Sequence, residues 1–494
     1  MEGNENPEAY WVDQLAYQVL KVPGRHVISS AITTSGPTHL GTVEEFLFPS
    51  VISSRLQELG DQPEFIFIGD IMDALDSVPA GLPAWLEEWL GKPLTSVPDP
   101  YGCHRSFGEH FLADTVSYMD RFDVKPKVIP ASDLYASGLY DDYVKLYYSK
   151  LDAVKRILEN TSLRKLPEGW MDIVMPVCEK CGKIATTRVT GFDGQYIYYS
   201  DDKDVGYAKG CGHSGKVPLS GHAWKMTWRL DWPTRQAFLG VTLEGAGKDH
   251  HTKGGSWDTA KAVHEELLGR KPPLSYRWGF VLLNGKKMSK SQGIGALSEI
   301  MGYIPPEVLK YFLLRVDIEK DKSIDDSGEG MLRLIDEFER DLREPMSEKR
   351  RMAVHLAQPS EGWEKPFVLL LLAYQLEGGW DGAKQRLALK SSYLRPYVER
   401  WVASQKLPDA YRISYSPRPA QGLVRKWIMG LRGDETGLEA SQKLRELANA
   451  SGIPVEQAFA EAYVCLLGKP MGPKLSSLVD AIGVRRLIKD LSSS

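Results

Sequence analysis

An apolar run over residues 26–32 is followed by a turn that contains Gly36 and then by helical periodicity over residues 43–59. The run has the length of a buried strand, and residues 64–69 and 127–130 form two more such runs. Strands that alternate with helices are typical of a parallel sheet covered by helices on both faces. We therefore expect an α/β domain whose functional residues gather where the strands end.

Later segments have a different character. Residues 171–221 are turn-rich and hold three cysteines, and strand–helix alternation is expected to resume around residues 238–243 and 277–283. After about residue 300 we expect helices without strands, including single helices over residues 384–402 and 475–488. The predicted domains are the first half of the α/β domain (1–165, with a metal-site insertion near 95–112), an inserted module like a zinc ribbon (166–222), the second half of the α/β domain (223–300), a connecting helical region (301–345) and an α-helical domain (346–494).

The composition excludes several classes of protein. With 43% hydrophobic and 26% charged residues the chain is expected to be globular, and no apolar run approaches the ~18 residues of a membrane span. Its formal net charge of −4 means that contact with nucleic acid must come from local basic patches such as Arg425–Lys426, where Trp427 either stacks on a base or is buried. The polar N-terminus does not resemble a signal peptide, so we expect a cytoplasmic protein with no membrane partner.

Two motifs about 250 residues apart have phosphate-binding chemistry. In residues 35–42 a glycine-containing turn precedes a helix, whose N-terminus favours anions, and His39 supplies a further donor. Residues 286–293 place three lysines and two serines in one loop, where ammonium groups would neutralise charge developing on a triphosphate. Either motif alone is compatible with an ordinary turn or a solvated basic loop. The pair indicates one ATP site built by two halves of a fold.

Zinc-ligand residue types cluster in an early segment. Asp99, Cys103, His104 and His110 lie within twelve residues, and zinc takes about four such ligands in a tetrahedron. The alternative is a loop that is polar by chance. Four of the five cysteines fall in metal-like groups, which favours metal over disulfides, and the fifth, Cys465, is expected in the core.

A second group has the spacing of a zinc ribbon. Cys178 and Cys181 are followed after 29 residues by Cys211 and His213, and glycines lie near both halves. We expect these four to hold a structural zinc, with His222 as the alternative fourth ligand. Such a metal would stabilise a module too small to fold on its own core.

Two further features suggest ligand binding. Residues 247–256 follow a strand-like run and include His250, and they either bind a ligand at the end of a strand or form a surface turn. Trp224, Trp228 and Trp232 crowd one segment beside arginines. Their rings form either a wall for a cation or part of the core.

Taken together, these residues resemble the class I aminoacyl-tRNA synthetases and, within them, the class I lysyl-tRNA synthetases. The resemblance runs from about residue 20 to about residue 490. It implies a Rossmann-type parallel-sheet catalytic domain with zinc-binding insertions and a C-terminal all-α helical cage that reads the anticodon. The segments that carry it are residues 99–104 with His110, 228–232, 247–250 with 254–256, and 468–473.

The resemblance also implies an activity. A lysine–tRNA ligase converts L-lysine and ATP to lysyl-adenylate, and then transfers the lysyl group to the 3′ end of tRNA(Lys). The implied cofactors are Zn²⁺ at two sites and Mg²⁺ with ATP, in a monomer. Alternatives are a class I synthetase for glutamate or cysteine, a nucleotidyltransferase of the same superfamily, and a catalytically silent RNA-binding relative.

Residue by residue, the resemblance places the ATP site at His39, Gly41, Thr42, Lys287, Ser289 and Lys290, with His39, Lys287 and Lys290 catalytic. It places the lysine site at Thr33, Ser35, Trp228, His250 and Tyr276. Thr42 stands where the family usually has asparagine or histidine. Asp70 and Asp73 replace a more acidic pattern, which leaves open the carboxylate that meets the lysine ammonium.

Overall fold

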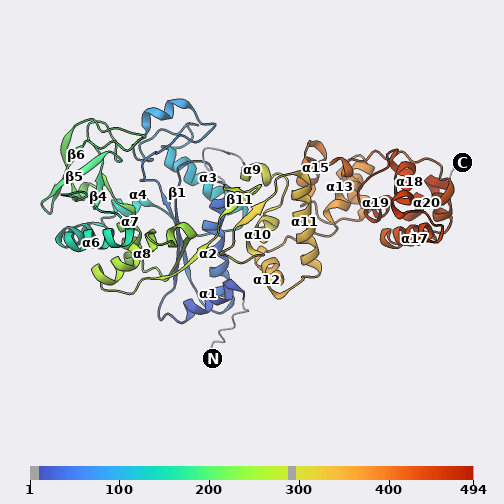
Figure 1. Cartoon of the computed structure of the whole chain (residues 1–494), viewed down its shortest axis with the longest axis horizontal. Helices are drawn as coiled ribbons and strands as arrows, with labels where there is room; N and C mark the ends of the chain where they lie inside the picture. Colours follow the sequence, from blue (N-terminus) through green and yellow to red (C-terminus); the bar gives the residue numbers. More distant parts are fainter. Residues whose placement is uncertain (1–9, 288–295, 493–494) are drawn as a thin grey trace. The chain divides into compact units, whose positions relative to one another are not determined.

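The computed structural model describes residues 10–287 and 296–492, and the chain divides into two compact units (Figure 1). The first, here called the α/β unit, comprises Met1–Leu297 and Val316–Ser323. The second, the helical unit, comprises Ser298–Arg315 and Ile324–Ser494. No helix within the described ranges is both long and apolar enough to cross a membrane.

The α/β unit is built on a five-stranded parallel sheet, as the alternating pattern predicts. The strand order is β10-β9-β1-β2-β3, so the chain adds strands on one side of β1 and then on the other. In open sheets of this kind ligands bind beyond the carboxyl ends of the strands, at the point where the order reverses. Here that point lies between β1 and β9. The strands are β1 (Val27–Thr33), β2 (Glu64–Asp70), β3 (Lys127–Pro130), β9 (Leu243–Gly247) and β10 (Leu274–Trp278).

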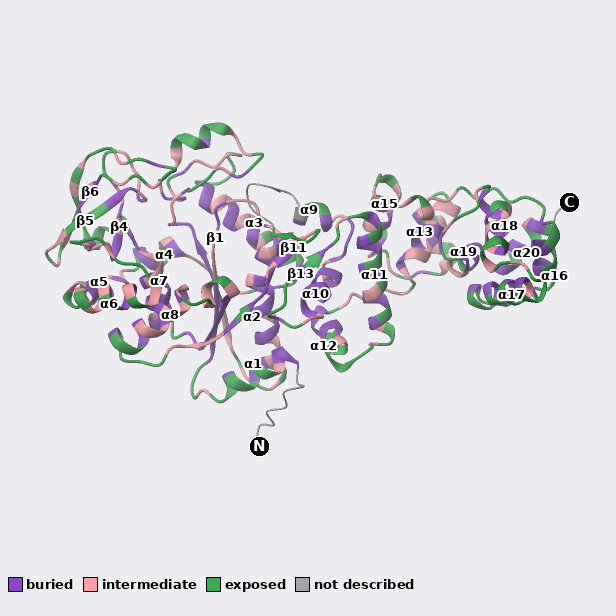
Figure 2. Ribbon diagram, in the orientation of Figure 1, coloured by how far each residue is buried: buried purple, intermediate pink, exposed green. Residues whose placement is uncertain are grey.

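Helices cover this sheet. Helix α2 contacts β1, β2 and β9, and its side chains Phe46, Leu47 and Phe48 are almost completely buried. Buried residues follow the strands and the inner faces of the helices (Figure 2). The helices of the unit are α1 (Trp11–Leu20), α2 (Leu40–Glu58), η1 (Ala84–Trp89), α3 (Phe107–Arg121), α4 (Ala131–Ala136), α5 (Asp141–Ser149), α6 (Leu151–Ser162), η2 (Leu219–Gly221), α7 (Trp228–Leu239), η3 (Lys248–His251), α8 (Ser256–Ala262) and η4 (Val263–Leu267), with α9 (Ala296–Ile300) at its boundary.

Small antiparallel sheets complete the α/β unit. Residues 171–221 form short strands as expected. Strand β9 begins later than predicted, because α7 continues to Leu239 and ends at Gly240, whose φ of 66° suits glycine. The strands are β4 (Val174–Pro176) paired with β8 (Trp224–Met226), then β5 (Thr187–Phe192), β6 (Tyr196–Asp201) and β7 (Ser214–Pro218), and finally the sheet β12-β11-β13 (Lys286–Lys287, Val281–Leu283, Lys322–Ile324). Strand β13 corrects the expectation that strands end near residue 300.

The helical unit contains the predicted helices, with two corrections. The expected helix over 384–402 is two helices, because Ala388 adopts a left-handed conformation (φ 54°), and Gly483 (φ 81°) likewise divides 475–488. The Trp427 ring is buried and its Nε1 donates to the Ala440 carbonyl at 2.8 Å, so it belongs to the core, whereas Cys465 is only half-buried. The helices are α10 (Pro306–Leu314), α11 (Gly328–Arg343), α12 (Glu348–Ala357), α13 (Phe367–Leu376), α14 (Trp380–Leu387), α15 (Arg395–Ala403), η5 (Asp409–Tyr411), α16 (Gly422–Met429), α17 (Gly437–Ala450), α18 (Val455–Leu467), α19 (Leu475–Ile482) and α20 (Val484–Ser492).

Candidate functional site

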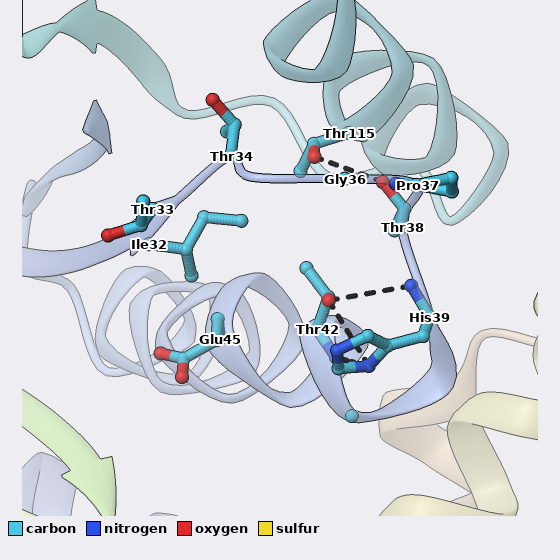
Figure 3. Close-up of a pocket in the computed structure, with 11 residues that line it drawn as sticks. Ile32, Thr33, Thr34, Gly36, Pro37, Thr38, His39, Thr42, Glu45 and Thr115 are labelled. Carbon is cyan, nitrogen blue, oxygen red and sulfur yellow. Dashed lines mark hydrogen bonds between the residues drawn. The ribbon is translucent and has the colours of Figure 1, made fainter. Parts of the chain in front are cut away.

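A cavity of about 170 Å³ lies where β1 ends and α2 begins (Figure 3). Its lining includes Thr33, His39, Gly41 and Thr42, so four of the predicted residues meet there. His39 is the N-cap of α2: its Nδ1 accepts from the Thr42 N–H at 3.2 Å, and the Thr42 hydroxyl lies 3.5 Å from the His39 N–H. Threonine therefore has a clear role at position 42, because it completes the cap that orients the histidine.

A second cavity, of about 260 Å³, shares His39, Gly41 and Glu45 with the first. It extends to His250 after β9 and to Lys287. A Cβ atom on Gly41 would lie 3.2 Å from the His39 ring, so glycine leaves room for the imidazole. The structure thus brings His39 and Gly41 of the first predicted ATP motif and Lys287 of the second to one cavity, at the reversal point of the sheet.

Lys287 represents the second motif here. Its ammonium lies 3.7 Å from the centre of the Phe280 ring, and that of Lys248 lies 4.5 Å from the same ring. Two cations therefore flank one aromatic ring at the cavity wall. Ser289 and Lys290 lie outside the described residues.

Glu45 is the acidic residue that both cavities share, and the sequence does not single it out, whereas Glu44 and Asp249 line the second cavity alone. The Glu45 side chain is half-buried, lines both cavities, and accepts from the Ser30 hydroxyl at 3.2 Å. Burial raises the pKa of Glu45 to about 8. In the view of Figure 3, Glu45 lies to the left of His39 and Thr42, as do Ile32 and Thr33. The available signal was a pair of acidic residues, Glu44 and Glu45, between apolar residues of one helix.

Tyr276 is a buried residue close enough to Glu45 for the charge of that carboxylate to act on it. It is buried in β10, and its hydroxyl has no hydrogen-bond partner among the residues that the structure describes. Burial and, next, the charge of Glu45 hold the pKa of Tyr276 well above its ordinary value. A buried hydroxyl without a hydrogen-bond partner is costly, and a donor, ideally a cation, could join it to the half-buried Glu45 carboxylate.

Asp70 and Asp73, the carboxylates left open by the sequence, already have a cation. The Lys225 ammonium, wholly buried, donates to Asp70 Oδ2 at 2.7 Å and also to Asp73 Oδ1. Burial and the neighbouring Asp73 raise the pKa of Asp70 to about 6. Burial would also raise the pKa of Asp73, but Lys225 outweighs it and holds that pKa below its ordinary value.

The other predicted lysine-site residues divide into two groups. His250 lines the second cavity, and burial lowers its pKa, which favours the neutral ring at pH 7. Trp228, Tyr276 and Ser35 do not line either cavity. The Trp228 ring stacks on Trp232 at 5.4 Å and lies 6.0 Å from the His250 ring, so it supports the site from behind.

Trp224, Trp228 and Trp232 do not come together as one wall of three rings. Trp224 is completely buried in a different core cluster, and its Nε1 donates to the Leu219 carbonyl at 2.8 Å. The face of Trp228 is already occupied by the guanidinium of Arg235, 5.0 Å from the ring centre. The three rings therefore do not form one wall for a cation.

The first group of metal-type ligands converges as predicted. Donor atoms of Asp99, Cys103, His104 and His110 lie within 4.8 Å of one another. Cys103 Sγ is 3.1 Å from His104 Nδ1 and 3.2 Å from His110 Nδ1. Zinc–ligand bonds of ~2.0–2.3 Å give tetrahedral edges of roughly 3.3–3.8 Å, and the two S···N distances are slightly shorter than this range, so the donors lie close enough together to share one ion.

The second group differs from the prediction in one ligand. Cys178, Cys181 and Cys211 converge with Asp201. His213 does not join them, because its Nε2 pairs with Glu179 at 2.8 Å, and the alternative His222 pairs with Asp141 at 3.1 Å. The Sγ atoms of Cys178 and Cys211 are 3.8 Å apart, close to the ~3.8 Å edge of a zinc–thiolate tetrahedron.

Comparison with known proteins agrees with this arrangement. The family described as "tRNA synthetases class I (K)" matches residues 9–360. Lysine–tRNA ligase 1 of Methanosarcina acetivorans is 33% identical over 94% of each chain. The lysine–tRNA ligase of Archaeoglobus fulgidus is 31% identical over 96% of this chain and 98% of its own. The chain therefore belongs to the class I lysyl-tRNA synthetases, a family of enzymes.

Proposed function

We propose that the chain is a lysine–tRNA ligase whose active site is the pair of adjoining cavities at the β1–β9 edge. The lysine carboxylate attacks the α-phosphate of ATP and releases pyrophosphate, and the lysyl group of the adenylate then passes to the terminal ribose of tRNA(Lys). The observation that carries the proposal is the shared lining: His39 and the half-buried Glu45 border both cavities, and Lys287 borders one. Lysine-dependent ATP–pyrophosphate exchange in the presence of tRNA tests it.

The ATP half of the site uses positioned donors. His39, fixed by its cap with Thr42, would donate to phosphate oxygens at the helix N-terminus, and Lys287 would neutralise charge on the leaving pyrophosphate. Gly41 keeps the first turn of α2 open. Ser289 and Lys290 extend this role on sequence grounds, and Mg²⁺ would accompany the phosphates. No side-chain nucleophile is required, since positioning and charge stabilisation lower the barrier.

The lysine half of the site is acidic. We assign the side-chain ammonium to Glu45, with the Tyr276 hydroxyl as a nearby acceptor and the neutral His250 and Thr33 around the rest of the amino acid. A half-buried carboxylate with a hydroxyl partner is well suited to a cation, and glutamate has no side-chain cation to pair with it. Cysteine likewise offers no cation and would leave Glu45 with the Ser30 hydroxyl as its partner.

The helical unit is the proposed tRNA-binding part, with the anticodon read within residues 346–494. Residues 411–494 contain twelve Lys and Arg against eight Asp and Glu, although the whole chain carries a net charge of −4. Among these, Arg425 and Lys426 are exposed on α16 while Trp427 is buried, so they could contact phosphates.

We also propose that zinc occupies both ligand groups in a structural role. All four donors are protein side chains in each group, which leaves no open position for chemistry. In the second group Asp201 Oδ1 accepts from the Thr186 hydroxyl at 2.5 Å. This hydrogen bond holds the carboxylate in place, with its other oxygen toward the sulfurs.

Replacing Cys178 by alanine should remove one of two zinc ions per chain and lower the free energy of unfolding by about 3 kcal/mol or more, because the buried thiolate closes a site that stabilises a small module. Metal analysis and thermal denaturation measure the two effects. The control is Cys465→Ala, a half-buried cysteine outside both groups, which should keep both ions. If the wild-type protein holds no zinc and Cys178→Ala has the same free energy of unfolding as wild type, both zinc assignments are contradicted.

A further inference from the structure

A buried lysine of the chain itself lies beside the substrate site. Lys225 belongs to β8, outside the parallel sheet, and its side chain is fully enclosed. Its ammonium bridges Asp70, the last residue of β2, and Asp73, three residues later. One cation thus fixes the backbone just beyond the carboxyl end of β2.

The bridge reaches the cavity through Asp73. The Asp73 side chain is 31% exposed, and its Oδ2 accepts from the Thr33 hydroxyl at 2.5 Å. Thr33 ends β1, lies opposite Asp70 in the parallel register, and lines the first cavity. Lys225, Asp73 and Thr33 therefore form a continuous chain of contacts from the interior to the cavity wall.

The neighbouring carboxylates show why this cation matters. Glu44 is paired with Lys322 at 3.0 Å, and Glu244 lies 3.9 Å from Arg235. Glu45, in contrast, is held by the Ser30 hydroxyl. An internal cation thus compensates each of these other buried acidic positions, and a substrate ammonium is directed to Glu45.

We propose that Lys225 is a positioning and specificity-determining residue for the amino-acid substrate: it holds Asp73 on Thr33 and prevents the Asp70–Asp73 pair from competing with Glu45 for the substrate ammonium. This inference rests on the proposed lysine–tRNA ligase activity. Without the Lys225 ammonium, two carboxylates would face each other beside the cavity, and Thr33 would lose its fixed partner.

The test is steady-state ATP–pyrophosphate exchange by the full chain with tRNA present. Lys225→Ala should raise the KM for lysine about tenfold or more while the KM for ATP changes less than about threefold, because the contacts lead to Thr33 and not to the ATP motifs. Added propylammonium should partly restore the lysine KM, since it fits the space of the missing side chain. Thr33→Val, which leaves the buried charges in place, should reproduce the rise in the lysine KM.

Lys310→Met is the matched control, because Lys310 is a buried lysine of the helical unit, and it should leave the lysine KM unchanged. If wild-type protein supports no lysine-dependent exchange, the proposed function fails. If wild type is active and folded Lys225→Ala keeps the wild-type lysine KM, or raises both KM values equally without amine rescue, the inference is overturned. Should Lys225→Ala not fold, a wild-type lysine KM in Thr33→Val overturns it.

Discussion

Replacing Glu45 by glutamine should raise the KM for lysine about 100-fold or more while the protein remains folded. The substitution keeps the shape and the hydrogen bond from Ser30 but removes the charge that the lysine ammonium would meet. Loss of one partner from a buried charged pair costs ~2–5 kcal/mol, which corresponds to roughly 30- to 4,000-fold in affinity. Steady-state exchange kinetics with lysine as the varied substrate measure the effect.

The control is Glu64→Gln. Glu64 is at the start of β2, at the opposite end of the sheet from the cavities, and pairs with Arg25 and Lys127 at the surface. Because such exposed pairs contribute ~0–1 kcal/mol, this change should leave the lysine KM within about threefold of wild type. A Glu45→Gln enzyme with the wild-type lysine KM would exclude Glu45 as the ammonium-binding residue.

The raised pKa of Glu45 adds a pH signature to this prediction. With a pKa of about 8, the carboxyl is protonated in the free enzyme at lower pH, and lysine must displace that proton to bind. The KM for lysine should therefore fall as pH rises from 6 toward 8. Glu45→Gln should lose this slope, which separates titration of Glu45 from titration of other groups.

Replacing His39 by asparagine should lower the kcat of lysine activation by about 100- to 1,000-fold, the usual effect of removing a donor that stabilises transition-state charge. Asparagine is chosen because it is a good N-cap and should keep α2 intact. The imidazole, which the Thr42 cap orients at the cavity, would be lost. Exchange kinetics and thermal denaturation together distinguish lost catalysis from lost structure.

His222→Asn is the matched control for the histidine substitution. His222 pairs with Asp141 outside the two cavities, and its backbone has a positive φ of 52°, which asparagine tolerates. Its kcat should remain near that of wild type. Comparable kcat values for His39→Asn and wild type would remove His39 from the catalytic groups.

The sequence predicts the framework of this site well, because local patterns determine it. The buried strand before Thr33, the glycine-containing turn and the cap residue His39 all lie within a short segment, and the structure confirms the helix that starts after His39. Glu45 could not be identified in this way. Helical periodicity assigns a charged residue to solvent, whereas the partial burial of Glu45 depends on packing with distant parts of the chain.

The second metal group shows the same limit. Cysteine spacing indicates which segments meet, but the fourth ligand depends on strand register. Strands β6 and β7 pair Ser200 with Ser214, which places Asp201 beside the sulfurs and leaves His213 turned toward Glu179. Likewise, the crowding of tryptophans did not reveal that Trp224 packs in a separate core from Trp228.

Amino-acid-dependent ATP–pyrophosphate exchange, measured across the twenty amino acids with and without tRNA, tests the central claim most directly. A site with the half-buried Glu45 and two ATP motifs should give exchange that depends on lysine when tRNA is present, with glutamate and cysteine inactive. Exchange that depends on another amino acid would contradict the assignment of lysine. Absence of exchange with every amino acid, even with tRNA added, would contradict ligase activity altogether.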